Sequence, residues 1–483
     1  MRSLALAVTI ASSLLAACSS APDPGDSPDG GTDANDAGDA GDGAADVEQG
    51  LFLATADRRG PIEWIPVDEA GIHARVTLVA DIDAALRQSV WGFSDDGKWL
   101  FYGLSNQDST TGSLWVRYLD GEPQRVDDAS KPYWSGLTWT NDKLFFVGGS
   151  EIAYGVDLPA SGVASAATRV SRQGKRVFSV PIAPSGNYVA MHFYGFQIPI
   201  VRAVQAMSAL GVDVSVCCSF GYYWDLSPRW GYVSDRELMV AGADYDHRDL
   251  SIAGISDTSP TTVHNPPQHG GLSVVHGAWS HDDRFIGYTV KKTLENLSHH
   301  LYIADVSSTP QRVEVTTVHT NNVQWRPGAN TRHVAYTEYP QVGAQQRVML
   351  GTVETNPLRV TTRPIIEYPS SALYGIDYEW NADGTAILHH GGATGEYAVT
   401  FIDASGTPTK VPLGLVFRDA DSTRWTIPYL GWSKDGRRLI CRTSTGYSIA
   451  SIDVAMKQVS APIELPTDID FAWWDRRIGK ASH

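Results

Sequence analysis

The chain has 483 residues, of which 42% are hydrophobic and 19% charged, and its formal net charge at pH 7 is −16. This composition can build a large core and excludes wholesale disorder, while the acidic charge argues against nucleic-acid binding, which needs a basic surface. The 45 Gly, 15 Trp and 20 Tyr favour β structure, because aromatic side chains suit a pleated sheet and glycine suits tight turns. Four cysteines are too few for a disulfide framework.

The chain begins with an export signal. Arg2 precedes an apolar segment, residues 4–17, that is too short to cross a bilayer as a helix. This segment ends in Leu15–Cys18 (LAAC), which resembles the lipobox of bacterial lipoproteins, and the resemblance implies cleavage before Cys18 and a lipid on its thiol. Ser19 then resembles the residue that follows the cysteine in lipoproteins sent to the outer membrane. We expect residues 1–17 to be a signal peptide, and an ordinary signal peptide with an incidental cysteine is the alternative.

An acidic segment follows the cysteine. Residues 19–50 contain nine acidic residues and no basic one, with Asp at about every third position. A calcium-binding loop is the alternative interpretation, but the spaced bidentate Glu and the hydrophobic flanks of such a loop are missing. We interpret residues 18–50 as a lipidated cysteine and a solvated, self-repelling tether. Without the nine acids and Arg2, 37 basic and 45 acidic residues remain of 38 and 54, so the rest of the chain is only mildly acidic.

From residue 51 onward one pattern recurs eight times: an apolar strand that ends in a large anchor residue, a polar turn rich in Asp, Asn and Gly, and a second apolar strand. The anchors are Phe93, Trp139, Ile182, Tyr232, Trp279, Trp325, Trp380 and Trp432. Their spacing of 43–55 residues leaves room for four strands per unit, which is the period of a β-propeller blade. The turn residues favour short hairpins, and we expect the anchors to fill the space between neighbouring blades.

The two ends of this region complement each other. Residues 51–57, 62–68 and 76–81 are typical of three later strands of a unit that lacks its first strand, and residues 469–474 are typical of a lone first strand. Pairing them would close the ring and remove both exposed sheet edges. We therefore predict an all-β protein: a single β-propeller at residues 51–476 with about eight four-stranded blades, within a range of seven to nine, and a C-terminal tail at 477–483.

The repeats also resemble a known family. The segment Trp432–Arg437 (WSKDGR) is similar to the repeats of TolB-type propellers (PD40, WD40-like), and the resemblance covers the architecture of about residues 51–476. Gly436 directly follows Asp435, which differs from the sialidase Asp-box, and the GH dipeptide of WD40 units does not occur. TolB carries an α/β domain before its propeller, and prolyl oligopeptidases carry a hydrolase domain. We expect neither here, so a Tol–Pal role or a peptidase activity does not follow from the resemblance.

The sequence lacks the usual catalytic motifs, since no G-x-S-x-G, HExxH or Walker A segment occurs. His299-His300 and His389-His390 are adjacent pairs on expected strands. Neighbours on a strand point to opposite faces, so neither pair forms a chelate by itself. No cofactor is predicted, and a divalent metal held by ligands from several blades at the central channel is the alternative.

The densest charged loop is residues 244–249 (DYDHRD). We single out Asp244, Asp246, His247 and Asp249 as a ligand-binding loop for a basic partner or a divalent ion, against the alternative of a solvated hairpin with internal ion pairs. Two other features stay open. Phe220, Tyr222, Tyr223 and Trp224 fit either a rim contact or inter-blade core, and Cys217, Cys218 and Cys441 fit either buried thiols or one disulfide.

Three functions compete. The first is a lipoprotein anchored in the bacterial envelope through Cys18, at the outer membrane on its periplasmic or surface face, whose monomeric propeller binds a protein, peptide or glycan at one rim. The second is a propeller enzyme (a lyase, lactonase or glycan hydrolase) with a metal or an acid/base pair at the channel, and the third is a structural surface protein. The fold is compatible with all three, and we rank them in that order.

Overall fold

The computed structural model describes residues 47–54, 59–68, 71–106, 112–127, 135–140, 142–148, 151–171, 176–180, 182–183, 186–193, 200–203, 213–214, 229–230, 236–244, 247–254, 261–264, 273–291, 299–328, 332–339, 345–368, 377–391, 395–416, 430–443, 446–466, 469 and 471–478. Within these ranges the regular structure is β-strand throughout, which confirms the predicted all-β class. No helix among these residues is long and apolar enough to cross a membrane.

The strands form antiparallel units of four strands, or five in the first and last unit, which we call blades 1–9. Blade 1 contains β38 (Phe471–Ile478), β1 (Val47–Ala54), β2 (Ile62–Asp68), β3 (Gly71–Ile72) and β4 (Val76–Val79). Blades 2 and 3 contain β5 (Arg87–Phe93), β6 (Trp99–Ser105), β7 (Gly112–Tyr118), β8 (Gln124–Arg125), β9 (Ser135–Trp139), β10 (Lys143–Gly148), β11 (Ile152–Asp157) and β12 (Thr168–Arg169). Blades 4 and 5 contain β13 (Val177–Ser179), β14 (Tyr188–Phe193), β15 (Ile200–Ala203), β16 (Asp213–Val214), β17 (Arg229–Trp230), β18 (Arg236–Asp244), β19 (His247–Gly254) and β20 (Thr261–His264).

The remaining four blades follow the same order. Blades 6 and 7 contain β21 (Ser273–Trp279), β22 (Phe285–Lys291), β23 (His299–Asp305), β24 (Gln311–Thr316), β25 (His319–Trp325), β26 (His333–Tyr339), β27 (Gln346–Thr355) and β28 (Leu358–Tyr368). Blades 8 and 9 contain β29 (Asp377–Trp380), β30 (Ala386–Gly391), β31 (Glu396–Ile402), β32 (Pro408–Val416), β33 (Leu430–Trp432), β34 (Arg438–Arg442), β35 (Tyr447–Asp453), β36 (Gln458–Val459) and β37 (Ile463–Glu464).

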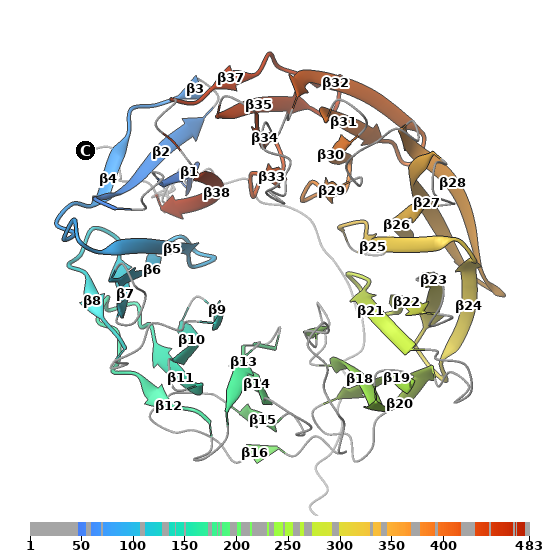
Figure 1. Cartoon of the computed structure of the whole chain (residues 1–483), viewed down its shortest axis with the longest axis horizontal. Coiled ribbons are helices and arrows are strands. Elements are labelled where there is room, and N and C mark those ends of the chain that lie inside the picture. The colour runs from blue at the N-terminus through green and yellow to red at the C-terminus, as the bar shows by residue number, and fades with distance from the viewer. Residues whose placement is uncertain are drawn as a thin grey trace, which may run out of the picture. The chain divides into compact units, whose positions relative to one another are not determined.

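The described residues thus form nine blades, at the upper end of the predicted range and one more than the expected eight. Blades 5 and 6 share one eight-stranded sheet only because of a single parallel pair, Arg248 with Ser273. The extra blade is blade 1, which the two chain ends build together. Figure 1 shows the blades in chain order around a ring, and the first strands that it labels reach furthest toward the centre of the ring.

The first and last strands pair as predicted. Eight residues of β1 face eight residues of β38 in antiparallel register, from Val47 opposite Ile478 to Ala54 opposite Phe471. The boundaries differ from the prediction, because β1 begins four residues before residue 51 and β38 extends two residues beyond 476. These extra residues continue the hydrogen-bonded ladder, so residues 47–50, which we assigned to the tether, belong to the propeller.

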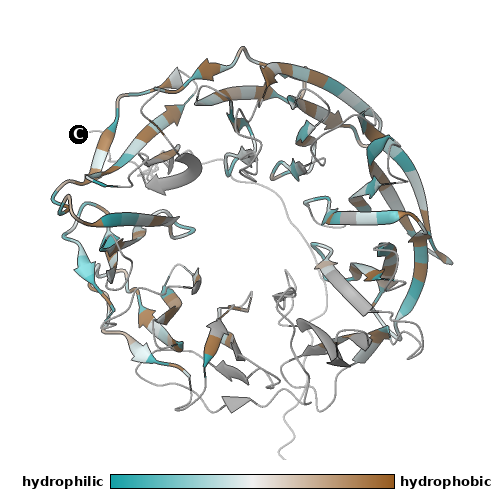
Figure 2. Ribbon diagram, viewed as in Figure 1, coloured by the Kyte–Doolittle hydropathy of each residue, from teal (hydrophilic) through white to brown (hydrophobic). Residues whose placement is uncertain are grey.

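Hydrophobic side chains between neighbouring blades form the core. Eight clusters each combine buried residues of two successive blades, and they cover every boundary of the ring except that between blades 4 and 5, where most side chains lie outside the described residues. Blade 1 packs on blade 9 through Leu51 and Ile65, and on blade 2 through Phe52 and Trp64. Figure 2 shows hydrophobic and hydrophilic bands alternating along the long outer strand β28, as expected for a sheet with one face on the core.

Each described anchor packs against the preceding blade. Phe93 stacks on Phe52 of blade 1, and Trp325 stacks on Phe285 of blade 6. Trp380 belongs to the hydrophobic cluster between blades 7 and 8. The indole Nε1 of Trp325 donates to the carbonyl of Ala278, and that of Trp432 donates to the carbonyl of Glu379. These acceptors directly precede the previous anchors, so neighbouring first strands run side by side in the same direction. Tyr232 lies outside the described residues.

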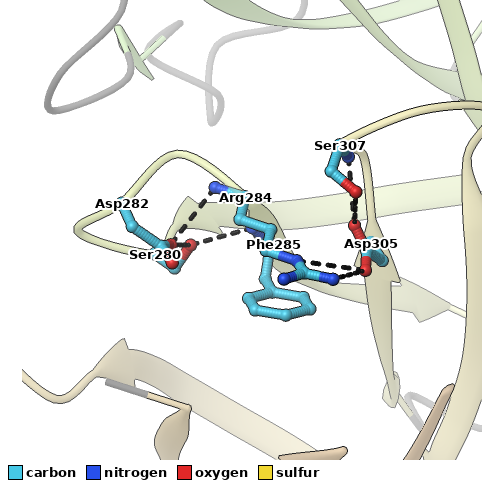
Figure 3. A network of polar contacts seen from close by, with 6 residues as sticks. All are labelled: Ser280, Asp282, Arg284, Phe285, Asp305 and Ser307. Carbon is cyan, nitrogen blue, oxygen red and sulfur yellow. Dashed lines mark hydrogen bonds and ion pairs between the residues drawn. The ribbon is translucent and has the colours of Figure 1, made fainter. Parts of the chain in front are cut away.

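The polar turns of blades 2, 3, 6 and 9 share one hydrogen-bond pattern, which Figure 3 shows for blade 6. In blade 6 the hydroxyl of Ser280 donates to Asp282 Oδ1 at 2.6 Å and accepts from the backbone N–H of Phe285 at 2.8 Å. Ser94 with Asp96, Thr140 with Asp142 and Ser433 with Asp435 repeat the contact between hydroxyl and carboxylate. Beside the turn, Arg284 donates to Asp305 at 2.8 Å. In these four blades the side chain of the residue after the anchor therefore closes the hairpin, whereas Ala183 and Arg326 stand at this place in blades 4 and 7.

Replacing Ser280 by alanine tests this turn. Ser280 is fully buried, so Ser280→Ala leaves the N–H of Phe285 without its side-chain acceptor and is expected to lower the free energy of unfolding by about 1–3 kcal/mol. Ser307→Ala is the matched control, because this exposed hydroxyl also donates to an aspartate, Asp305, and its loss is expected to cost less than about 0.5 kcal/mol. Chemical denaturation of both variants decides, and equal effects would contradict the structural role of Ser280.

The strand order divides the propeller edge into two rims. The turn rim carries the connections between first and second strands and between third and fourth strands of each blade. The loop rim carries the connections between second and third strands and those between blades. In blade 1 the C-terminal end of β38 and the N-terminal end of β1 meet at the turn rim, where the other blades have their polar turns. Lys434 of blade 9 and Asp95 of blade 2 lie 4.0 Å apart across this position.

Candidate functional site

The hairpin predicted to bind a ligand lies at the loop rim of blade 5. Asp244 pairs with His247 at its tip, and Asp249 pairs with Ala241 two pairs further along the ladder. Asp246 lies outside the described residues, as do the side chains of the other three predicted ligands. The backbone therefore places the hairpin, and its role in binding stays a prediction.

Several other predicted features also fall outside the described residues: Cys18, Cys217, Cys218, and the aromatic residues Phe220, Tyr222, Tyr223 and Trp224. Cys441 is described. It carries a free thiol that is fully buried between blades 8 and 9, and burial raises the pKa of this thiol. A buried thiol with a raised pKa is a poor nucleophile, so Cys441 serves as core.

The histidine pairs divide between the two faces of their strands, as strand geometry predicts. His300 Nδ1 lies 2.7 Å from Glu314 Oε1 on the outer strand of the same blade. Its neighbour His299 instead contacts the next blade, where its ring centroid lies 5.0 Å from that of His319.

His389 and His390 divide in the same way. His389 Nδ1 lies 2.7 Å from the Tyr368 hydroxyl of blade 7, and Nε2 lies 2.9 Å from Thr400 Oγ1. The ring of His390 packs at 4.8 Å from that of Tyr397, on the face toward blade 9. Burial lowers the pKa of His389 to about 3 and that of His390 to about 4, so both rings are neutral at physiological pH.

His389 occupies a core position that recurs in the fold. The registers place it two residues beyond the strand partner of the anchor, where Tyr102, Tyr288 and Tyr336 stand in blades 2, 6 and 7. All four side chains are almost completely buried. The contact between His389 and Tyr368 has a counterpart in which the histidine and the tyrosine have exchanged positions. There the hydroxyl of Tyr288, at the core position, lies 3.0 Å from Nδ1 of His264 on the outer strand of blade 5. His389 is therefore structural rather than a ligand of a channel metal.

The structure does bring polar side chains together at the loop rim between blades 6 and 7. Lys291 stands opposite His299 in blade 6, and His319 stands opposite Tyr339 in blade 7. The rings of His319 and Tyr339 lie 5.5 Å apart, in addition to the contact between His299 and His319. All four side chains are half-buried and keep access to solvent. We call Lys291, His299, His319 and Tyr339 the blade 6–7 cluster.

A backbone hydrogen bond sets the chemistry of this cluster. The N–H of His299 donates to His319 Nδ1 at 3.1 Å. An amide can only donate, so Nδ1 carries no proton and the proton of the neutral ring is on Nε2. His319 is therefore a donor at Nε2 rather than a metal ligand, and Lys291 and Tyr339 add an ammonium and a hydroxyl. This set suits carbonyl, hydroxyl or carboxylate oxygens of a ligand, and the three rings offer stacking surface.

The described residues contain no group of three or more His, Cys, Asp or Glu side chains that could hold a metal ion. The metal alternative therefore has no site in this part of the chain. Among the described residues, the acid/base alternative has a candidate in Glu379 on the innermost strand of blade 8. Burial raises the pKa of this carboxyl group to about 7, so it can both release and take up a proton near neutral pH.

The fold agrees with solved structures, although no family model and no curated protein matches the sequence. A crystal structure of the eukaryotic initiation factor is similar over 89% of this chain and 98% of that chain, with a TM-score of 0.55 and 12% identity. The fold is a β-propeller.

Two other propellers are less similar. The periplasmic gluconolactonase PpgL of Pseudomonas aeruginosa aligns with a TM-score of 0.38 at 15% identity, over 86% of this chain and 95% of its own. An oligogalacturonate lyase in complex with manganese aligns with a TM-score of 0.42 at 12% identity, over 86% of this chain and 100% of its own. These two alignments carry no argument about this chain, and the resemblance to TolB-type repeats continues to rest on the WSKDGR segment.

Sequence reasoning identified His299 but missed its partners. His319 and Tyr339 are the first residue of β25 and the last of β26, and no motif links them to His299 in the chain. The available signal was the repeat itself. Successive blades pack side by side in chain order. The third strand of one blade and the first strand of the next blade therefore both begin at the loop rim, as β23 and β25 do.

Proposed function

We propose that this protein is an envelope-anchored lipoprotein whose propeller binds a protein, peptide or glycan ligand at its loop rim. The observation that carries the proposal is the place where the chain enters the propeller. β1 begins at the turn rim, next to the end of β38. A lipid on Cys18, followed by an acidic tether over residues 19–46, would therefore attach the turn rim to the membrane and direct the loop rim away from it.

The tether length fits this arrangement. A flexible segment over residues 19–46 has a root-mean-square span of about 30 Å, and repulsion among its acidic residues extends it further. The propeller is thus held near the bilayer, with enough freedom to meet a ligand in the envelope. Both candidate binding features, the residue 244–249 hairpin and the blade 6–7 cluster, lie at the loop rim.

An enzymatic function is the second candidate, and Glu379 is the observation that favours it. A carboxyl group with a pKa of about 7 on an innermost strand is suited to general acid or base catalysis. Desolvation alone also accounts for the raised pKa of a single such group, whose backbone carbonyl accepts a hydrogen bond from Trp432 of blade 9. The binding function therefore ranks first.

A cross-linked pull-down of the tagged protein from intact envelopes tests the proposal. We expect one dominant partner, which is lost when Asp244, Asp246 and Asp249 are changed to Asn and His247 to Ala. The matched control neutralises three acids at the turn rim (Asp95→Asn, Asp120→Asn and Glu122→Gln) and is expected to keep the partner. A Cys18→Ala form is expected to leave the membrane fraction and lose the partner.

Two results would contradict this proposal. If the loop variant retains the partner, the residue 244–249 hairpin is excluded as the binding site. If both the loop variant and the turn-rim control lose the partner, binding depends on overall negative charge rather than on a specific site. A pull-down that recovers no partner would favour the enzymatic function, for which Glu379→Gln is the first variant to assay.

A further inference from the structure

Three exposed apolar side chains mark the turn rim on both sides of blade 1. Among the described residues, four large hydrophobic side chains are strongly exposed: Leu119 at 45%, Val163 at 67%, Met456 at 64% and Ile463 at 49%. Leu119, Val163 and Met456 lie on the turns between third and fourth strands of blades 2, 3 and 9. Ile463 lies instead on the outer strand β37.

The backbone holds Leu119 in its exposed position. Its φ of +46° lies in the left-handed region, which leucine rarely adopts. The turn is nevertheless well bonded, because the N–H of Leu119 donates to the Lys98 carbonyl at 2.7 Å and that of Gly121 donates to the Tyr118 carbonyl at 2.8 Å. A strained residue that also exposes apolar surface is more consistent with a contact to another surface than with a role in folding.

The turn that carries Val163 is fastened to blade 2. Gln124 donates to the Gly162 carbonyl at 2.6 Å and accepts from the N–H of Ala164 at 2.8 Å. Gly162 itself lies so close to the Tyr118 ring that a Cβ there would be 2.7 Å from it. The turns that carry Leu119 and Val163 are therefore joined by direct contacts between blades 2 and 3.

Met456 is held in a comparable way in blade 9. Its N–H donates to Asp453 Oδ1 at 2.9 Å, and the next residue, Lys457, has a φ of +51°. The Lys457 ammonium reaches Thr409 of blade 8 at 3.3 Å, which leaves Met456 at the apex of the turn.

We propose that Leu119, Val163 and Met456 insert into the surface of the lipid bilayer, so that the turn rim rests on the membrane. This inference rests on the proposed lipid anchor. The tether enters the propeller at blade 1, between the blade that carries Met456 and the blades that carry Leu119 and Val163. The rim that carries these side chains is therefore the one that the tether holds toward the lipid. Residues 19–46 contain no hydrophobic side chain larger than proline that could cover them.

The expected contact is a shallow one. The turns that carry these residues contain both signs of charge, such as Asp120 beside Leu119 and Lys457 beside Met456. We therefore expect binding to a zwitterionic surface through apolar insertion, rather than attraction to anionic lipids. The propeller would then be fixed in orientation, with its loop rim parallel to the membrane and facing the envelope space.

Fluorophore labelling on vesicles tests the insertion. The chain from residue 19 carries an N-terminal hexahistidine tag and is held on phosphatidylcholine vesicles that contain a nickel-chelating lipid, with Cys217 and Cys218 changed to serine. An environment-sensitive dye is placed at Leu119→Cys, Val163→Cys or Met456→Cys. Brominated acyl chains are expected to quench the dye at least about twofold at these three positions. Ile463→Cys, an equally exposed apolar position away from the turns, is the matched control and is expected to be unaffected.

A second measurement avoids the label. Changing the three residues together to serine is expected to weaken retention on the vesicles about tenfold or more in an imidazole titration, whereas Ile463→Ser leaves it unchanged. Quenching at the three positions equal to that at 463 would overturn the proposal. A dye response that depends on protein concentration without vesicles would replace the bilayer with a second copy of the chain. Because the tag replaces the lipid on Cys18, the rim is tested even if fractionation of the full chain shows no lipidation there.

Discussion

Ending the chain at Asp470 is expected to abolish the monomeric propeller. This truncation removes β38 (Phe471–Ile478), which supplies the innermost strand of blade 1 and eight pairing positions to β1. The edge of β1 would then be exposed along its whole length, and such an edge pairs readily with other chains. We expect aggregation or formation of oligomers in size-exclusion chromatography, and loss of a cooperative thermal transition.

A chain that ends at Ile478 is the matched control. It lacks only residues 479–483, so the complete ladder between β1 and β38 is kept, and we expect it to behave like the full chain. A synthetic peptide of residues 469–478 added during refolding is expected to restore part of the monomer. If the chain that ends at Asp470 stays monomeric with an unchanged melting temperature, the closure of the ring by β38 is wrong.

Acid is expected to unfold the protein through His389. The unfolded chain binds a proton at this histidine near pH 6.5, whereas the buried ring accepts one only near pH 3. The unfolded state therefore binds more protons between these values, so stability is full above about pH 6.5 and falls as the pH is lowered toward 3. The shift corresponds to about 4–5 kcal/mol from this one residue, and His390, with a pKa near 4, adds to the same trend.

His389→Gln separates titration from packing. The variant loses one of the two hydrogen bonds, to Tyr368 or Thr400, and is expected to be less stable at pH 7 by about 1–3 kcal/mol. Its stability should nevertheless depend less steeply on pH between 6.5 and 3, as measured by urea denaturation at several pH values. His73→Gln changes a histidine that is 45% exposed and serves as control. An unchanged pH slope in His389→Gln would contradict burial as the source of acid sensitivity.

The turns and the blades could be predicted because their causes are local. The residue after the anchor, the aspartate and the glycine lie within a few positions of one another in WSKDGR, and their hydrogen bonds form within the hairpin. The apolar strands on either side of the turn repeat with a regular period, so the blade followed from the sequence. The blade count was less certain, since blade 1 combines the two most distant parts of the chain.

The candidate sites depend on contacts that no local pattern records. The residue 244–249 hairpin was recognised from its charges, but the cluster of Lys291, His299, His319 and Tyr339 joins four strands of two blades. The raised pKa of Glu379 likewise comes from its burial in the folded chain.

The sequence by itself determined the repeat, the hairpin turns, the anchors and the expected export signal, because each depends on residue type and spacing along the chain. Only the tertiary structure decided that there are nine blades, that Val47 and Ile478 meet at the turn rim, and that His319 faces His299. These are consequences of ring closure, which sets the distance between residues from different blades without regard to their separation in the sequence.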